Sequence, residues 1–87
     1  MAWFVYIIEA SDKSLYTGIT TDPRRRFQEH ASGQRGAKYF RGRDAVSIAF
    51  IEEHHDRSSA SQREAQIKKL DRRKKLELIR NNKRPTG

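Results

Sequence analysis

Two short apolar segments near the start of the chain, residues 4–8 and 15–19, dominate its hydrophobic pattern. Each has the length and the β-branched and aromatic content of a strand, and the polar stretch between them has turn chemistry. With a three-residue loop, Tyr6 pairs with Gly18, and Tyr16 becomes a diagonal neighbour of Tyr6 on the same face. Gly18 then leaves bare backbone opposite Tyr6, with room for a water or a ligand. The pattern therefore predicts a hairpin.

The first segment is apolar at both odd and even positions, which predicts a central strand covered on both faces. After the second segment, Asp22 followed by Pro23 is typical of a helix N-cap and first helical position. This helix is expected to contain Phe27 and Ala31, one turn apart, and to end at residues 32–33. Residues 34–44 are rich in glycine and basic residues, which predicts a surface loop or one short helix.

A third strand is predicted over residues 46–51, again apolar on both faces and followed by polar residues. A helix is expected from Ser58, with its apolar residues on one side. Asp71 is expected to cap a last helix whose inward residues are Leu76 and Ile79. The inward residues expected of the preceding helix are Ala60, Ile67 and Leu70.

The predicted element order is β-β-α-(loop)-β-α-α. It indicates an α+β fold in which a small three-stranded antiparallel sheet is flanked by helices. The pattern further predicts one domain over residues 1–80 and a polar C-terminal tail over residues 81–87.

Composition narrows the classes of function. The chain has 87 residues and no cysteine, which excludes a disulfide framework, a thiolate zinc site and a cysteine nucleophile. No apolar stretch approaches the length that spans a membrane, and the N-terminus lacks the features of a secretory signal. We therefore expect a cytoplasmic protein without a membrane partner.

The charge of the chain points to a polyanionic partner. The formal net charge is +8, with eight basic and eight acidic residues up to position 56 but eleven basic and three acidic residues from 57 to 84. Two basic concentrations on a small domain suit the phosphates of nucleic acid. Solvated helix faces, or an anionic membrane surface, are the alternative interpretation. The basic helices have no strong apolar face for lying on lipid.

Three residues are candidates for chemistry. Arg26 and His30 are four apart on the first predicted helix and share a face, where they suit phosphate binding and proton transfer. An ordinary surface pair is the simpler interpretation. Glu64 lies at the edge of the apolar stripe of the second helix, and a carboxylate there suits one magnesium ion.

Capping offers another role for Glu64. A capping box starting at Ser61 would use Glu64 as its acidic member, whereas one starting at Ser59 would use Gln62 and leave Glu64 unengaged. Both boxes fit the sequence, so the two roles stay open at this point.

Together these residues resemble the GIY-YIG nuclease superfamily. The resemblance rests on Val5-Tyr6-Ile7, Tyr16-Thr17-Gly18, Arg26-x-x-x-His30 and a late helical glutamate, in that order. It covers roughly residues 3 to 80 and is strongest to small stand-alone bacterial members. Thr17 stands where the motif has isoleucine, a departure that removes no reactive group.

The resemblance implies a metal-dependent DNA endonuclease that hydrolyses phosphodiester bonds, in DNA repair or recombination. It assigns catalysis to Tyr6, Tyr16, Arg26, His30 and Glu64, with Glu64 holding one Mg²⁺ or Mn²⁺ ion. Tyr6 would take a proton from water, although Tyr16 in that role stays open. An unperturbed tyrosine titrates near pH ~10, so this base needs positive charge nearby.

DNA is the implied partner, and an association with the nucleoid is implied by it. The residues expected to contact nucleic acid are Arg24, Arg25, Lys38, Tyr39, Arg41, Arg43, Lys68, Lys74 and Lys75. One alternative is a nucleic-acid-binding module that has lost catalysis. Another is a nuclease that depends on a protein partner for specificity.

Overall fold

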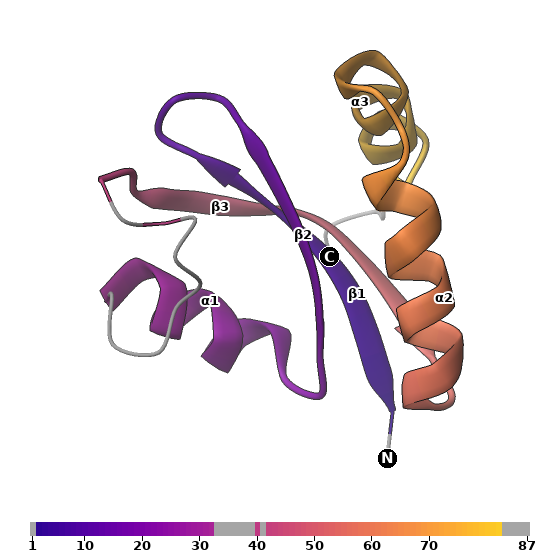
Figure 1. The fold of residues 1–87 in the computed structure, drawn as a ribbon. Coiled ribbons are helices and arrows are strands. Elements are labelled where there is room, and N and C mark those ends of the chain that lie inside the picture. The colour runs from indigo at the N-terminus through magenta and orange to yellow at the C-terminus, as the bar shows by residue number, and fades with distance from the viewer. Residues whose placement is uncertain (1, 33–39, 41, 83–87) are drawn as a thin grey trace.

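The computed structural model describes residues 2–32, 40 and 42–82. It has a three-stranded antiparallel sheet of order β2-β1-β3 and three helices (Figure 1). The elements in chain order are β1 Trp3–Ala10, β2 Leu15–Thr20, α1 Pro23–Ser32, β3 Ala45–His54, α2 Arg57–Lys68 and α3 Arg72–Asn81. This order confirms the predicted α+β fold.

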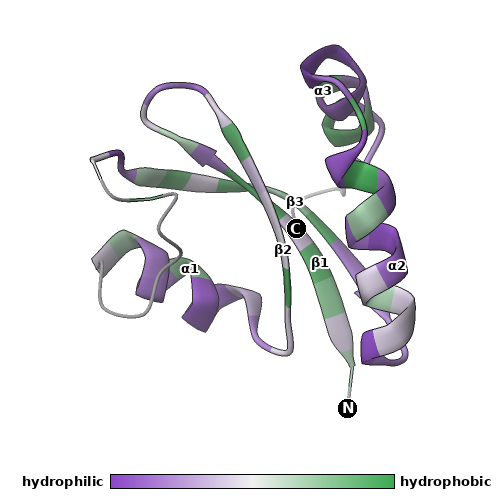
Figure 2. Ribbon diagram, viewed as in Figure 1, coloured by the Kyte–Doolittle hydropathy of each residue, from purple (hydrophilic) through white to green (hydrophobic). Residues whose placement is uncertain are grey.

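β1 is the central strand, as predicted, and separates two apolar clusters. On one face Val5 and Ile7 pack with Ala60 and Ile67 of α2. On the other face the cluster contains Tyr6, Ile8 and Ala10, with partly buried residues of α1 and β3 packed against it. α1 and α2 therefore cover opposite faces of the sheet (Figure 1). Figure 2 shows the same division, with hydrophobic strands between largely hydrophilic helices.

The register of the hairpin is the predicted one, because Tyr6 pairs with Gly18 and Ile8 with Tyr16. Lys13 adopts a positive φ of 72° in the turn. The expected space over Gly18 is absent: a Cβ added to Gly18 would lie 2.5 Å from the Tyr6 hydroxyl oxygen. The prediction of room for a ligand there was wrong, because the tyrosine itself lies over the glycine.

α1 begins as predicted. Pro23 is its first residue, and Asp22 Oδ1 accepts a hydrogen bond from the Arg25 backbone N–H at 3.2 Å. Phe27 packs against the sheet, but Ala31 is exposed and His30 is buried instead. The reason is that His30 hydrogen-bonds a core tyrosine, which turns this side of the helix inward.

β3 is longer than predicted. It continues through Glu52 and Glu53, which pair with Val5 and Phe4 of β1, and ends at His54. Pairing with a long central strand outweighs the low strand propensity of these glutamates. At its other end Val46 is 56% exposed, so the prediction of two apolar faces fails there.

α2 begins at Arg57, and its N-cap is Asp56, whose Oδ1 accepts from the Ser59 backbone N–H at 2.8 Å. Neither predicted capping box is therefore used, and Glu64 lies in the middle of the helix. The predicted inward residues Ala60 and Ile67 are buried, whereas Leu70 lies beyond the helix end.

α3 has the predicted cap, because Asp71 Oδ1 accepts from the Lys74 backbone N–H at 2.9 Å. Leu76 was wrongly expected to face inward, since it is 38% exposed, and Leu78 packs in the core beside Ile79. The Asn82 side-chain amide donates to the Ile51 carbonyl at 3.1 Å. The boundary at residue 80 stays a prediction.

The predicted loop at 34–44 lies mostly outside the described residues. Its described end is tied to the hairpin turn, because the Ser11 backbone N–H donates to the Asp44 carbonyl at 2.8 Å. None of the helices in the described ranges combines the length and the apolar character needed to cross a membrane.

Candidate active site

An aromatic cluster lies on the sheet face covered by α1. Tyr6 and Tyr16 come from neighbouring strands, with ring centroids 6.3 Å apart. His30 of α1 lies 6.1 Å from the Tyr6 ring and 5.3 Å from the Tyr16 ring. Phe40 closes the cluster at 5.3 Å from Tyr16 and 4.8 Å from His30. The structure thus brings together three of the predicted catalytic residues.

A hydrogen bond joins two of these rings. The Tyr6 hydroxyl lies 3.1 Å from His30 Nε2, and both residues are 2% exposed. The absence of a side chain at Gly18 makes this position of the Tyr6 ring possible, because a Cβ there would also lie 2.7 Å from the ring carbon bearing the hydroxyl. The hairpin register and the helix together fix the hydroxyl in space.

The surroundings of Tyr6 hold its proton firmly. Burial, followed by the neighbouring Tyr16, raises the pKa of Tyr6 from 10.0 to about 12. Arg26 acts in the opposite sense, and Glu64 adds a smaller raising effect. Arg26 and Glu64 therefore both influence the pKa of the Tyr6 hydroxyl, although they come from helices on opposite sheet faces.

His30 is neutral at pH 7. Burial, together with the nearby positive charge of Arg26, lowers the pKa of His30 from 6.5 to about 4. A neutral imidazole carries one unprotonated ring nitrogen. In the tautomer with Nε2 unprotonated, His30 accepts the hydrogen bond from the Tyr6 hydroxyl.

Arg26 is partly buried beside this pair. Its Nη1 donates to Glu29 Oε1 at 2.9 Å, and the side chains are 29% and 21% exposed. Burial disfavours the charged guanidinium, but hydrogen bonding to Glu29 and Tyr6 outweighs burial and raises the pKa of Arg26. A permanent positive charge is therefore held next to the Tyr6 hydroxyl.

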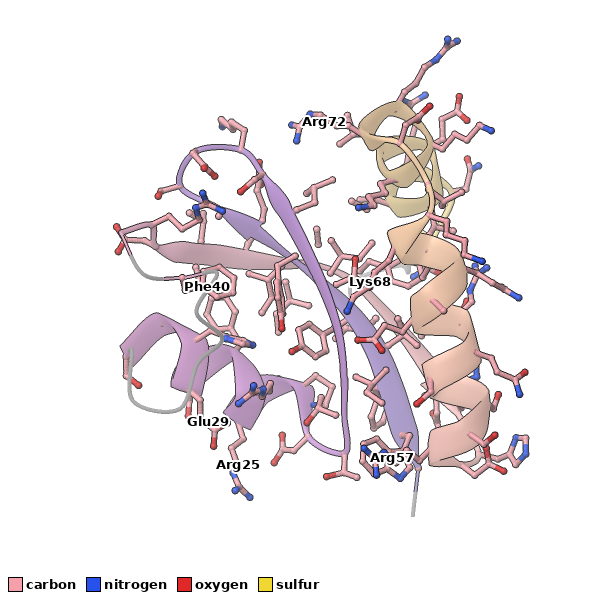
Figure 3. All side chains as sticks on the ribbon, viewed as in Figure 1. Arg25, Glu29, Phe40, Arg57, Lys68 and Arg72 are labelled. Carbon is pink, nitrogen blue, oxygen red and sulfur yellow. The ribbon has the colours of Figure 1, made fainter. Side chains whose placement is uncertain are left out.

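Glu64 lies on α2, with its carboxylate 3.3 Å from Lys68 Nζ and 22% exposed. Figure 3 shows Lys68 extending from α2 toward the sheet. Within the described ranges, no group of three or more histidine, cysteine, aspartate or glutamate side chains is arranged to hold a metal. A single mid-helix carboxylate fits Mg²⁺, which often takes one protein carboxylate and fills its shell with water and phosphate oxygens.

The residues predicted to contact nucleic acid occupy several places. Arg24 lines a cleft of about 410 Å³ between α1 and β3, and Arg25 is 71% exposed. Arg43 pairs with Asp12 of the hairpin turn at 3.3 Å. Lys74 is exposed and Lys75 half-buried on α3. Lys38, Tyr39 and Arg41 lie outside the described residues.

Two residues of this region were missed from the sequence. Glu29 follows Arg26 by three positions, a spacing that predicts a contact on a helix, but it was not among the predicted site residues. Phe40 was passed over in favour of Tyr39. No periodic pattern in that segment shows which aromatic residue points inward.

Comparison with known proteins places these features in a family. The chain matches the GIY-YIG catalytic domain over residues 2–77. A UPF0213 protein from Syntrophus aciditrophicus (strain SB) is 49% identical over 79 residues, which cover 91% of each chain. The UPF0213 protein YhbQ of Escherichia coli O157:H7 (strain EC4115 / EHEC) is 47% identical over 77 residues, covering 88% of this chain and 76% of that protein.

Two solved structures are also similar. The solution NMR structure of the UPF0213 protein BH0048 from Bacillus halodurans has 42% sequence identity and a TM-score of 0.62, and the match covers 98% of this chain and 89% of that one. The solution NMR structure of the protein EF2693 from E. faecalis has 34% identity and a TM-score of 0.64, covering 93% and 85%. Both support the fold described above.

Proposed function

The chain belongs to the GIY-YIG family of nucleases, and from that premise we propose that it is a metal-dependent DNA endonuclease that hydrolyses phosphodiester bonds. The observation that carries the proposal is the cluster of Tyr6, Tyr16 and His30. The charges of Arg26 and Glu64 both act on the pKa of Tyr6 in that cluster. A role in DNA repair or recombination, in the cytoplasm and near the nucleoid, is part of the same proposal.

Tyr6 is proposed to take the proton of the attacking water. With a pKa of about 12, Tyr6 is protonated at neutral pH, so its hydroxyl must first pass its own proton to solvent, directly or through His30 Nε2 at 3.1 Å, before it can accept one from water. Arg26 already lowers the pKa of Tyr6 against the effect of burial, and a bound cation would lower that pKa further. Neutral His30 can accept the hydrogen bond of the Tyr6 hydroxyl and orient it, and Tyr16 positions the water from the next strand.

Arg26 is proposed to stabilise the negative charge that develops on the phosphate in the transition state. A guanidinium matches the oxygens of a phosphate geometrically and stays charged throughout the pH range of the reaction. Because Arg26 is held partly buried, its charge acts in a less screened environment than that of a surface arginine.

Glu64 is proposed to hold one Mg²⁺ or Mn²⁺ ion, which when bound would act as a Lewis acid on the phosphate. The carboxylate is accessible enough to reach, and Lys68 would have to give up its ion pair with Glu64 to admit the cation. That exchange frees the Lys68 ammonium for a DNA phosphate.

The proposed DNA-contacting surface combines basic residues of the three helices with residues of the segment between α1 and β3. It comprises Arg24, Arg25, Lys38, Tyr39, Arg41, Arg43, Lys68, Lys74 and Lys75. Because α1 and α2 lie on opposite faces of the sheet, a DNA strand contacting both would have to cross an edge of the sheet, and β2, which carries Tyr16, is an edge strand.

A DNA-binding module that does not cut alone is the second candidate. Two observations favour it. The raised pKa keeps Tyr6 protonated at neutral pH, and the ion pair with Lys68 occupies the Glu64 carboxylate that would hold the metal. A protein partner that supplies specificity would be consistent with either candidate.

The deciding test is cleavage of labelled DNA by the purified protein, using duplex, flapped, branched and single-stranded substrates. Each is incubated with Mg²⁺, with Mn²⁺ and with a chelator. The proposal expects cleavage of at least one substrate that depends on the divalent ion. Salt-dependent binding to DNA without cleavage of any substrate would support the second candidate instead.

A further inference from the structure

Glu29 is bound to two consecutive arginines of α1. Its Oε1 accepts from Arg26 Nη1 at 2.9 Å, and its Oε2 accepts from Arg25 Nε at 3.4 Å. Figure 3 shows Arg25 and Glu29 projecting from the same side of α1. The two contacts differ in character, because the Arg25 side chain is 71% exposed whereas the Arg26 side chain is 29% exposed.

We propose that Glu29 is a positioning residue that holds the Arg26 guanidinium in its place beside the Tyr6 hydroxyl. This inference rests on the nuclease function proposed above and adds a residue to it. Glu29 lies immediately before His30 on a regular helix, so one rigid element carries the arginine, its anchor and the histidine.

The geometry separates this contact from an ordinary surface ion pair. Exposed pairs contribute little, because water and salt screen them and the side chains must be ordered. The Arg26–Glu29 contact is short and partly buried, and hydrogen bonding from Arg26 is the main cause that lowers the pKa of Glu29. An arginine side chain loses much rotamer freedom when it binds a phosphate. A guanidinium that is already anchored has lost that freedom beforehand, so ordering it in the transition state costs less entropy.

The alternative role for the same contact is masking, in which the Glu29 carboxylate neutralises the Arg26 guanidinium and keeps it from binding a DNA phosphate. A carboxylate beside the catalytic arginine repels DNA phosphates, so removing it from a masked arginine would raise both affinity and rate. Removing it from a positioned arginine leaves affinity unchanged or slightly tighter but lowers the rate at saturating DNA. The split between affinity and rate therefore distinguishes the two roles.

The kinetic test is a double-mutant cycle of Glu29→Ala and Arg26→Ala, with Glu77→Ala of α3 as a control that removes the same charge from an exposed site. We expect Glu29→Ala to lower the cleavage rate by a factor of about 10 while Glu77→Ala does not. In the Arg26→Ala background, Glu29→Ala should have no further effect, and Glu29→Gln should recover part of the rate. An unchanged or faster Glu29→Ala enzyme would overturn the inference.

A second measurement does not depend on turnover. In NMR spectra of the uniformly ¹⁵N-labelled protein, an anchored guanidinium rotates slowly and gives separate Nη signals. We expect resolved signals for Arg26 in the wild type and in Glu77→Ala, and averaged signals in Glu29→Ala with an unchanged fold. Averaged Arg26 signals in the wild type would refute the positioning role. If the wild type does not cut any substrate, this measurement alone decides the inference, while the proposed function fails separately.

Discussion

At the scale of single residues, the site depends on a missing side chain as much as on the reactive ones. The Tyr6 ring lies over Gly18 of the neighbouring strand, and from that position its hydroxyl reaches His30 Nε2 at 3.1 Å. Any side chain at Gly18 would push the ring away, since the added Cβ would lie 2.5 Å from the hydroxyl oxygen. The glycine and the tyrosine therefore act as one unit.

The role of Tyr6 is tested by Tyr6→Phe, which removes one hydroxyl and keeps the ring. If Tyr6 accepts the proton, cleavage should slow by a factor on the order of 10² to 10⁴, while DNA affinity stays near wild type. The melting temperature should fall modestly, because the hydroxyl makes one buried hydrogen bond, worth about 1 kcal/mol. A Tyr6→Phe protein that cuts at full speed would contradict this role and direct attention to Tyr16.

Thr17, one position before Gly18, lowers the stability of the fold in a way that the sequence does not reveal. Its hydroxyl is buried, the residue is 3% exposed, and the oxygen has no hydrogen-bond partner within the described part of the chain. Thr17→Val keeps the shape and should stabilise the fold by about 1 kcal/mol, raising the melting temperature by several degrees. Calorimetry checks this, and a lower melting temperature would show that the hydroxyl is satisfied in solution.

His30 should make stability depend on pH. Its pKa is about 4 in the folded chain and 6.5 when unperturbed, so between these values the unfolded chain binds the extra proton. Stability should therefore fall as the pH drops from 6.5 to 4, by at most about 1.4 kcal/mol per unit. Urea unfolding across this range measures the slope, which should flatten in His30→Gln. An equal slope in both proteins would show that other groups cause it.

At the scale of elements, capping decides where α2 begins and hence what Glu64 can do. Asp56, Ser59 and Ser61 all have side chains that cap helices, so local sequence does not choose among them. The choice of Asp56 as the N-cap follows from β3, which pairs with β1 as far as His54, so that Asp56, two residues later, is the first of these three side chains after the strand. Glu64 is then a mid-helix residue that has no part in the cap.

The cap predicts a specific mutational pattern. Asp56→Ala should destabilise the protein by about 1 kcal/mol, whereas Asp56→Asn should stay near wild type because asparagine caps helices equally well. Denaturant unfolding of both variants measures the difference. If Asp56→Ala has no effect and Ser59→Ala does, the helix starts later than the structure places it.

The limits of prediction from sequence are also clearest at this scale. The hairpin register, the central strand and the caps at Asp22 and Asp71 follow from local rules, and the structure confirms them. The inward face of α3 did not follow, since Leu78 rather than Leu76 packs beside Ile79. Three apolar positions on a short helix allow more than one orientation, and only its docking against the sheet selects one.

At the scale of the whole molecule, the candidate site draws on both faces of the sheet. α1 supplies Arg26 and His30 on one side, and α2 supplies Glu64 on the other. Their order in the sequence, through the resemblance to the GIY-YIG superfamily, predicts that they belong to one catalytic site, and that assignment stays a prediction. Their distances and the burial of Tyr6 depend on tertiary packing and were not predictable from local pattern, whereas the Arg26–Glu29 contact follows from helix spacing.

Metal-dependent cleavage by this protein is tested most directly by comparing Glu64→Gln with Glu77→Gln. Both remove one carboxylate charge, but only Glu64 is the proposed metal ligand, and its partner Lys68 is exposed enough to tolerate the loss. Rate with Mg²⁺, DNA affinity in a chelator and melting temperature are measured for each. We expect Glu64→Gln to lower the metal-dependent cleavage rate by a factor of about 10² or more, with DNA affinity and melting temperature close to wild type. Glu77→Gln should keep all three properties. Full-speed cleavage by Glu64→Gln, or loss of its cooperative melting, would contradict the account.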